Sequence, residues 1–503
     1  MIRAARLAIM MSILAVAVRL ICIDQPYLDN WSWRQSDVAA IARNYFQGSF
    51  HFAHPQIDWA GDESGYVGTE FPILPFLAAI CYKIFGVHEW VGRVQALILF
   101  AVSLPFFFLL VRKIFGETAA TWALFFYGFA PVGIMAGRCF MPDMPSLGLS
   151  IIGLYFFQRW IDESELCTRR VRPIGGPGWR VRSISFFASA FCISLSILIK
   201  LPSILVGAPL ACLALQRFRS SSFKRFDLWF FAAIALLPSV FWYGHAYQIA
   251  LQFYPHHFFG AGGVQIMSAA WYLKISKEIV TSTLTPIIFA LGCVGILAAR
   301  SIARARMFQW WLAAMILFIV IVGYGNRHQW YQLPLIPIAA PFAGAACAFV
   351  GPKMSSRAMR IALSILLAGS FGFSAFVYGR DFYQPSAASL RDAGLVLKRI
   401  TPASALVVAA DNGDPTVLYY AERKGWHFLE KNGIYDGEPR DSAQAIVDLE
   451  ALRRRGASYL VFTSNTLWWL DYYEEFGQYL QKTSTLVEPT SEFRIYKLNP
   501  VLK

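Results

Sequence analysis

The sequence predicts a polytopic α-helical membrane protein that ends in a small α/β domain. Of its 503 residues, 56% are hydrophobic and only 15% are charged, whereas soluble proteins carry about 25% charged residues. Apolar runs of membrane-spanning length recur as far as residue 378, and the chain then becomes more polar, with alternating strand and helix patterns. These observations place most of the chain in a bilayer and its tail outside it.

Eleven apolar runs are long enough to cross roughly 30 Å of hydrocarbon. They lie near residues 7–23, 91–111, 119–137, 145–161, 184–200, 202–216, 228–245, 281–299, 309–324, 333–350 and 360–378. Helices are expected because lipid offers backbone groups no hydrogen-bond partner. We predict about eleven spans, and up to thirteen when ambiguous stretches such as residues 71–86 are included. No small-x-small cleavage site follows the first run, which is therefore interpreted as an uncleaved span.

Basic residues form six short clusters between these runs, and the clusters set the orientation. They are Arg3/Arg6, Arg112/Lys113, Arg169–Arg182, Arg217–Arg225, Arg300–Arg306 and Lys353–Arg360. By the positive-inside rule, the clusters and the N-terminus face the cytoplasm, as in a multi-pass protein of the cell inner membrane. The segments expected to face outward are Asp24–Trp90, Arg138–Asp143, the turn at Lys200, His245–Glu278, Gly325–Tyr331 and the tail after Val377. Because the net charge of +14 comes from these clusters, it does not indicate a nucleic-acid partner.

The chain is expected to have a membrane domain over residues 1–380 and a tail domain over residues 381–503. Within the first outer loop, Asp37–Phe46 and Phe71–Phe85 are predicted to be short helices lying in the membrane interface. In the tail, the segments SALVVAA, SYLVF, STLVEP and EFRIYKL are typical of strands. The segment DSAQAIVDLEALRRRG is typical of an amphipathic helix that ends at Gly456.

Several activities are disfavoured because their motifs are absent from the sequence. There is no Walker-type glycine loop, no G-x-S-x-G, no HExxH and no dinucleotide-binding fingerprint, and the eight cysteines lack metal-ligand spacing. The candidate residues below face away from the cytosolic pool of nucleotide sugars. An activated sugar on the outer side would have to cross the membrane on a carrier, such as a polyprenyl phosphate.

Asp37 and Glu70 are the first candidates for catalysis. Each precedes an apolar stretch in the outer loop, and Arg34 lies close before Asp37. Two carboxylates at one cavity can divide the work, because one deprotonates an acceptor hydroxyl while the other orients it or helps to bind a divalent metal ion. The alternative is that both acids only solvate loop ends or cap helices.

Asp143 and a set of outward residues complete the candidate site. Asp143 lies between two prolines at a helix corner, where it is also a natural N-cap, and Arg138 is close to it. Lys200 ends a span, and a cation there can hold a lipid phosphate, although a snorkelling lysine is the alternative. Three further candidates for phosphate or sugar binding are Arg327, His328 and Tyr331, although interfacial anchoring by Trp330 and Tyr331 is the alternative. His256 and His257 lack a third ligand at a recognisable spacing and are interpreted as loop residues.

In these segments the sequence resembles the membrane-embedded GT-C glycosyltransferases, in particular the branch of protein O-mannosyltransferases and the lipid A aminoarabinose transferase. The resemblance covers about residues 1–350. It rests on the order and spacing of WRQSDVAAIARNYF, GTEFPILPFLAAICYKIFGVHEWVGR, RCFMPDMPS, ILIKLPS and HQWYQLPLIP.

The resemblance implies single displacement with inversion at the anomeric carbon. It makes Asp37 the base or metal-binding acid, Glu70 the second acid, Asp143 the acid at the third span, and Lys200 the lysine near the carrier phosphate. Two departures matter. Many relatives carry an Asp-Glu pair after the first span where this chain has Asp29-Asn30, so Asp29 is an alternative to Asp37. Relatives of the lipid A branch follow the second acid with Lys, and here Phe71 occupies that position.

The leading hypothesis is therefore a glycosyltransferase that moves a sugar from a polyprenyl-phosphate carrier to a glycolipid, polysaccharide or protein of the cell envelope, such as lipopolysaccharide. The site and the tail domain would lie on the periplasmic side. The alternatives are a lipid or polysaccharide flippase and a non-catalytic assembly factor. A flippase would carry ionisable residues deep within its spans, whereas here the charges gather at the ends of the runs.

Overall fold

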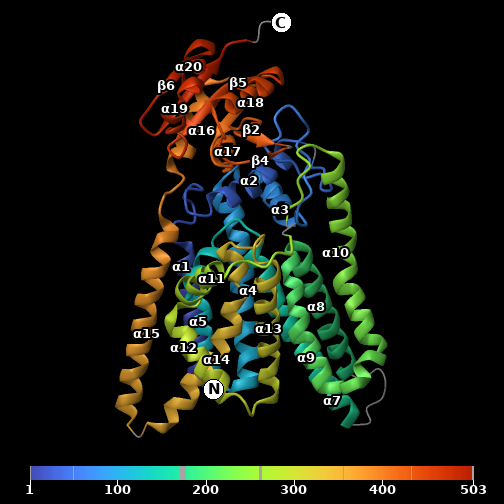
Figure 1. Ribbon diagram of the computed structural model, residues 1–503. Coiled ribbons are helices and arrows are strands. Elements are labelled where there is room, and N and C mark those ends of the chain that lie inside the picture. The colour runs from blue at the N-terminus through green and yellow to red at the C-terminus, as the bar shows by residue number, and fades with distance from the viewer. Residues whose placement is uncertain are drawn as a thin grey trace. The chain divides into compact units, whose positions relative to one another are not determined.

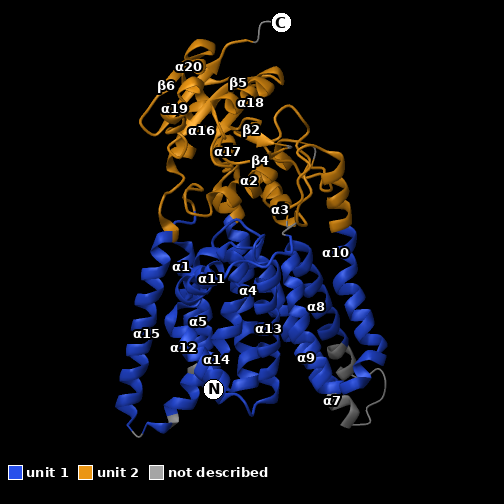
Figure 2. Ribbon diagram, viewed as in Figure 1, with its two compact units in different colours: residues 1–23, 93–242, 260–381 blue, residues 24–92, 243–259, 382–503 orange. Residues whose placement is uncertain are grey.

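The computed structural model describes residues 2–48, 50–169, 177–259, 263–354, 356–431 and 433–500. Parts of three predicted segments fall outside these ranges, namely residues 170–176 of the third basic cluster, residue 355 of the sixth, and residues 260–262 of the outer loop His245–Glu278. The chain forms two compact units (Figure 2). The first comprises residues 1–23, 93–242 and 260–381, and the second comprises residues 24–92, 243–259 and 382–503.

The first unit is helical, and each predicted apolar run falls on one or two of its helices (Figure 1). The helices are α1 (Ile2–Leu20), α4 (Glu89–Phe115), α5 (Glu117–Phe129), α6 (Pro131–Ala136), α7 (Asp143–Arg169), α8 (Pro177–Ile199), η1 (Leu201–Val206), α9 (Gly207–Phe218), η2 (Arg219–Lys224), α10 (Phe226–Gln252), α11 (Ala269–Glu278), η3 (Ile279–Thr283), α12 (Thr285–Ala298), η4 (Ala303–Ala305), α13 (Arg306–Val322), η5 (Gln329–Gln332), α14 (Leu335–Val350), η6 (Gly351–Lys353) and α15 (Arg357–Gly379).

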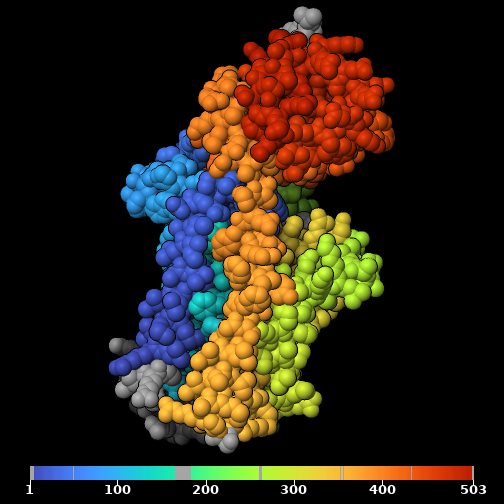
Figure 3. Space-filling model, turned by 90° about the vertical axis from the view of Figure 1, so that its left-hand side faces the viewer, coloured from blue at the N-terminus to red at the C-terminus, as the bar shows by residue number. Residues whose placement is uncertain are grey.

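Five helices among the described residues are long and apolar enough to cross a membrane, or six when the bent pair formed by Ala269–Thr283 (α11 with η3) and α12 is counted as one span. This test uses length and composition alone, so the expected eleven spans and their orientation stay predictions. The helix α15 has the character expected of a lipid-facing element. Its exposed side chains include Ile365, Leu366, Phe373 and Phe376. The helix runs along the face shown in Figure 3.

Small residues and one buried arginine hold the first unit together. A Cβ on Gly295 of α12 would lie 1.8 Å from the carbonyl oxygen of Phe342 in α14, so these helices pack at backbone contact. Arg19, near the end of α1, donates to the carbonyl oxygens of Gly128 and Gly133 at 2.8 and 2.9 Å. These bonds satisfy a buried cation and fix α1 against α5 and α6.

The second unit is an α/β assembly. Its remaining helices are α2 (Ser32–Gln47), α3 (Ile73–Phe85), η7 (Arg380–Tyr383), α16 (Ala388–Ile400), α17 (Thr416–Ala421), α18 (Ser442–Arg454), α19 (Trp469–Tyr472) and α20 (Glu474–Thr483). The strands are β1 (Leu406–Ala410), β2 (Gly425–His427), β3 (Glu430–Lys431), β4 (Ile434–Tyr435), β5 (Ala457–Thr463), β6 (Ser484–Pro489) and β7 (Phe493–Leu498). The four predicted tail strands and the helix that ends before Gly456 are all present.

Five strands form one sheet in the order β2-β1-β5-β7-β6. Strand β1 pairs in parallel with β2 and β5, with Val408 opposite Trp426 and Leu460, whereas β7 pairs antiparallel with β5 and β6. One face of the sheet packs against α18 and α20, where Leu449, Leu452 and Phe476 are buried.

The other face of the sheet is covered partly by the first outer loop. Ile41 and Tyr45 of α2, with Ile57 and Val67 of the loop, share a core with Leu390, Val407 and Val461 of the tail. The structure therefore groups residues 24–92 with the tail, whereas the predicted boundary at residue 380 left them with the membrane domain. Both predicted loop helices form, but most of α2 is buried. Ser32, Ser36 and Arg43 of α2 are bonded to the tail, which the sequence pattern does not reveal.

Candidate functional site

Most of the predicted site residues form two groups, one in each unit, and each group includes a tryptophan that was not predicted. The first-loop cluster in the second unit consists of Asp29, Arg34, Asp37, Trp59 and Glu70. The Lys200 cluster in the first unit consists of Asp143, Lys200, Trp330 and Tyr331. The contacts within each group are described separately below.

Asp29 stabilises the start of α2. Its carboxylate Oδ1 accepts hydrogen bonds from the backbone N–H of Trp31 at 3.0 Å and from Nε2 of Gln35 at 2.9 Å, and the side chain is fully buried. An aspartate that bonds the backbone two residues ahead is a common way to begin a helix. Asp29 is thus held rigidly, five residues before Arg34.

Arg34 and Glu70 form a buried ion pair. Nη2 of Arg34 lies 2.9 and 2.8 Å from the two carboxylate oxygens of Glu70. Thr69 donates a further hydrogen bond to Glu70, and the Arg34 guanidinium lies over the ring of Phe259. Both oxygens of Glu70 are therefore engaged by one cation, an arrangement that fixes the arginine in place.

Asp37 is held by the indole of Trp59. Its Oδ1 accepts from Trp59 Nε1 at 2.9 Å, and the side chain of Asp37 is only 3% exposed. Burial raises the pKa of the Asp37 carboxyl, while Arg34, the Trp59 hydrogen bond and His427 oppose the shift. A carboxylate with a raised pKa is a better proton acceptor, which suits a general base.

Two histidines adjoin this cluster, and sequence reasoning missed both. The rings of His257 and His427 lie 5.6 and 5.3 Å from the Trp59 ring, and Nδ1 of His427 is 2.8 Å from Oδ1 of Asp411. Burial lowers the pKa of His257 to about 4, an effect strengthened by Arg34 and opposed by Glu70. Burial alone would lower the pKa of His427 as well, but Asp411, with Asp37 and Asp414, raises it overall.

The arrangement of Asp37 and Glu70 does not fit the predicted metal-binding pair. Glu70 is neutralised by Arg34, and Asp37 accepts from an indole. Among the described ranges, no group of three or more His, Cys, Asp or Glu residues is placed to hold a metal ion. Hard divalent cations need several oxygen ligands around one point. We therefore derive no step of the chemistry through a metal ion.

In the first unit, Asp143 and Lys200 come together as the sequence predicts. Asp143 is the first residue of α7, and Lys200 lies between α8 and η1. Lys200 Nζ is 3.5 Å from Asp143 Oδ1 and 4.6 Å from the centre of the Tyr331 ring. A cavity of about 30 Å³ is lined by both charged side chains together with Ser203, Trp330 and Tyr331. An ammonium group held by a carboxylate and an aromatic face can serve as a phosphate ligand.

The other predicted residues of this unit are placed differently. The His328 ring stacks on the Trp330 ring at 4.4 Å, beside the Lys200 cluster, whereas Arg327 is exposed and lies over the ring of Tyr324. Arg138 is buried and donates to the carbonyl oxygens of Ile21 and Cys22, which follow α1. These two hydrogen bonds give Arg138 a structural role, because they hold the segment that follows α1.

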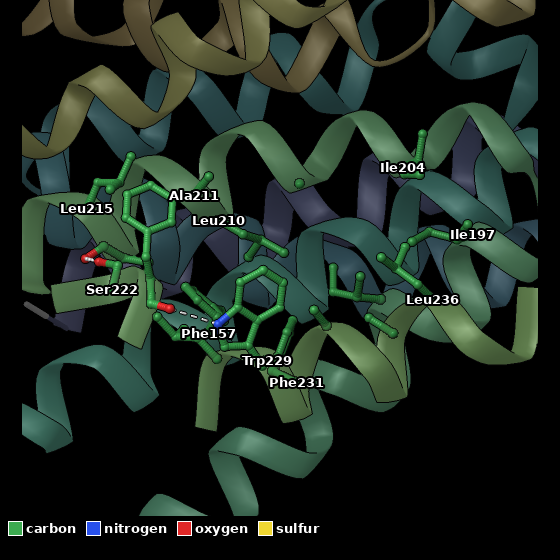
Figure 4. A pocket seen from close by; sticks show the side chains of 17 residues that line it. Phe157, Ile197, Ile204, Leu210, Ala211, Leu215, Ser222, Trp229, Phe231 and Leu236 are labelled. Carbon is green, nitrogen blue, oxygen red and sulfur yellow. Dashed lines mark hydrogen bonds between the residues drawn. The ribbon is translucent and has the colours of Figure 1, made fainter. Parts of the chain in front are cut away.

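A larger apolar cavity lies beside η1 (Figure 4). It has a volume of about 330 Å³ and is lined by side chains of α7, α8, η1, α9 and α10, among them Phe157, Ile197, Ile204, Leu210 and Trp229. In the view, Ile197 and Ile204 lie at one end and Ser222 at the other. Ile204 belongs to the same short helix as Ser203, which lines the Lys200 cavity. Lys200 is therefore about one helical turn away from a cavity whose apolar lining suits a hydrocarbon chain.

Known proteins resemble this chain in one sequence segment and in the fold. Residues 69–168, which include Glu70, Arg138 and Asp143, match the family model described as dolichyl-phosphate-mannose-protein mannosyltransferase. The comparison with curated proteins gave no match. The resemblance to these glycosyltransferases identified from the sequence is confirmed by this match.

The similar solved structures extend over nearly the whole chain. ArnT from Cupriavidus metallidurans in the apo state has a TM-score of 0.68 and 16% identity, with 98% of each chain covered. The same protein bound to undecaprenyl phosphate has a TM-score of 0.65 and 15% identity, with 97% of each chain covered. The apo oligosaccharyltransferase of Archaeoglobus fulgidus has a TM-score of 0.66 and 14% identity, covering 95% of this chain and 70% of that one. At these identities the likeness establishes the shared fold.

Proposed function

We propose that the protein is a glycosyltransferase that transfers a sugar from a polyprenyl-phosphate carrier to an acceptor hydroxyl on the outer face of the cell inner membrane. The observation that carries the proposal is the fold, which matches ArnT over 98% of both chains and also matches the form of ArnT bound to undecaprenyl phosphate. The acceptor belongs to the cell envelope and is a glycolipid, a polysaccharide or a protein.

In this proposal the Lys200 cluster receives the carrier. Lys200 is buried beside the ring of Tyr331. It lies between α8 and η1, and side chains of both helices line an apolar cavity of about 330 Å³. A carrier with a phosphate head and an isoprenoid chain requires both of these features. As the bond between the anomeric carbon and the phosphate oxygen breaks, its electron pair moves to the phosphate, and the ammonium of Lys200 stabilises the added charge.

The first-loop cluster supplies the base. The acceptor oxygen forms the new bond to the anomeric carbon from the side opposite the leaving phosphate, so the configuration inverts, and its proton passes to a carboxylate. Asp37 is the proposed carboxylate because burial raises its pKa, and Asp29 is the alternative. Glu70 acts through Arg34, because both of its oxygens are bonded to that guanidinium.

The test is incorporation of labelled sugar into envelope material by the wild type and by Asp37→Asn, Asp29→Asn and Glu70→Gln at equal protein levels. Loss of a general base is expected to lower the transfer rate by about 10²-fold to 10⁴-fold. Asp62→Asn is the matched control, since Asp62 belongs to the same unit and forms a partly exposed pair with Arg455. Full activity in all three variants would contradict the proposed chemistry and favour a flippase or an assembly factor.

A further inference from the structure

Helix α2 carries two of the proposed functional residues, Arg34 and Asp37, and one row of its side chains is bonded to the tail. Ser32 Oγ donates to Asp414 Oδ2 at 3.1 Å, and Ser36 Oγ lies 3.0 Å from Thr416 Oγ1. Positions 32 and 36 are one helical turn apart, so both bonds lie along the same side of α2. Thr416 is the first residue of α17 and Asp414 lies in the turn before it, and α17 packs against α2 (Figure 1).

The receiving turn of the tail is itself well defined. Oδ1 of Asp414 accepts from the backbone N–H of Thr416 at 3.0 Å, while its Oδ2 receives Ser32. Thr416 is fully buried. Because one carboxylate bonds both the tail backbone and α2, the position of α2 along its axis is coupled to the start of α17.

A second set of contacts fixes the other end of α2. Arg43 pairs with Asp58 and donates to the carbonyl oxygen of Tyr419 in α17. Lys424 of the tail lies 2.9 Å from Asp58 Oδ1 and 3.0 Å from Asn44 Oδ1. Two cations and a carboxylate from three segments therefore meet at this end, so α2 is held at both ends.

The loop that holds Asp37 is also attached to the tail. The carbonyl oxygen of Asp58 accepts from the backbone N–H of Gly425 at 3.0 Å, and Gly61 donates to the carbonyl of Gly425 at 2.7 Å. These bonds pair the loop with the edge strand β2. Trp59 lies between them in sequence, bonds Asp37 and packs beside His427 of the same strand. The tail therefore fixes the position of the Asp37 carboxylate in two ways, through α2, which carries Asp37, and through the loop that holds Trp59.

We propose that the C-terminal segment, residues 382–503, is the positioning platform for helix α2, and that Asp414 and Thr416 are positioning residues for the acids and the arginine on and beside that helix. Neither residue is assigned to the substrate. Their effect on catalysis rests on the proposed function, whereas their effect on the order of α2 does not.

The first test measures amide hydrogen exchange of α2 in the full-length protein. Thr416→Val keeps the shape of the side chain and removes the hydroxyl, and Ser36→Ala removes its partner. Losing one such bond is expected to raise exchange in residues 33–40 by about threefold to tenfold, with little change in α3. The Ser36→Ala/Thr416→Val double variant should show no more exchange than either single variant, because the two changes remove the same bond.

Thr416→Ser should restore the wild-type exchange. Ser389→Ala is the matched control, because Ser389 forms a hydroxyl–hydroxyl contact of 2.8 Å with Ser464 inside the tail. Wild-type exchange of α2 in both Thr416→Val and Ser36→Ala would overturn the proposal. So would equal loosening of α2 by Ser389→Ala.

The second test measures transfer. Thr416→Val should lower kcat by about tenfold and leave the KM for the lipid-linked donor within about twofold, because Lys200 belongs to the other unit. Thr416→Ser should recover the rate. A donor KM that rises while kcat stays constant would overturn the catalytic part of the proposal. If the wild type shows no transfer at all, the proposed function fails, and the exchange experiment still decides the role of the tail.

Discussion

The two clusters each contain a buried acid–base pair, and the pairs differ in geometry. Arg34 engages both oxygens of Glu70 at 2.8 and 2.9 Å. Lys200 approaches one oxygen of Asp143 at 3.5 Å, beyond the range of about 2.7–2.9 Å typical of a charge-assisted hydrogen bond, and also lies over the Tyr331 ring. The first pair is tightly bonded, and the second is a looser contact.

This difference suits the two pairs to different tasks. An arginine bonded to both carboxylate oxygens loses two strong hydrogen bonds when it changes partner, so the pair favours a fixed position. An ammonium at 3.5 Å gives up less when it turns toward an incoming phosphate, which can offer it shorter bonds. We therefore interpret the Arg34–Glu70 pair as a brace for the first loop and the Lys200–Asp143 pair as the place where the carrier head binds.

The largest effect is expected on the stability of the second unit when the Arg34–Glu70 ion pair is removed. Arg34→Met leaves the Glu70 carboxylate buried without its cation, which should lower the free energy of unfolding of the second unit by about 3 kcal/mol. The check is amide exchange or thermal unfolding in detergent. Adding Glu70→Gln should recover a large part of the loss, whereas Arg440→Met, which breaks an exposed pair with Asp441, should change stability by less than about 0.5 kcal/mol. If the Arg34→Met protein were as stable as the wild type, the Arg34–Glu70 pair would not be what stabilises the first loop.

The second-largest effect is expected on the binding of the lipid-linked donor when Lys200 is replaced. Lys200→Met should raise the KM for the lipid-linked donor by about 100-fold, because a charge-assisted contact to phosphate is lost. Its effect on unfolding should be smaller than that of Arg34→Met, since the pair it breaks is looser. Lys353→Met is the control, because Lys353 is an exposed lysine of the same unit that lies over Phe349. An unchanged donor KM in Lys200→Met would remove this lysine from the carrier site.

The sequence predicts the helices of the first unit and the strands of the tail well, because both follow from local patterns. Apolar length alone places residues 91–111 on α4 and residues 360–378 on α15. Asp143 and Lys200 were both candidates from the sequence, since each lies at the end of an apolar run, and the structure shows that they form a pair. These predictions needed periodicity, run length and the distribution of charge.

The burial of α2 could not be predicted in this way. Ser32, Ser36 and Arg43 have the appearance of a solvated helix face, but Ser36 meets a residue 380 positions away. His257 was set aside because it lacked a third metal ligand, and its actual neighbours, Trp59 and Arg34, lie in a distant segment. A single sequence contains no local signal for such long-range pairs, so the link between the first loop and the tail appears only in the fold.

The smallest of the three effects is on stability at acidic pH. It is expected at the first-loop cluster and not at the Lys200 cluster. His257 has a pKa of about 4 in the folded protein and about 6.5 when unfolded, so between these values the unfolded chain binds more protons. The contribution of His257 to the stability of the second unit should therefore fall as pH drops from 6.5 toward 4, by about 1 to 2 kcal/mol for this partly exposed ring. The raised pKa values of Asp37, His427 and Asp414 act in the opposite direction. His257→Gln should remove that part of the pH dependence, and the exposed His88→Gln should leave it in place. Exchange of α2 amides measured at pH 7 and pH 5 provides the check, and an equal acid response in wild type and His257→Gln would show that another group is responsible.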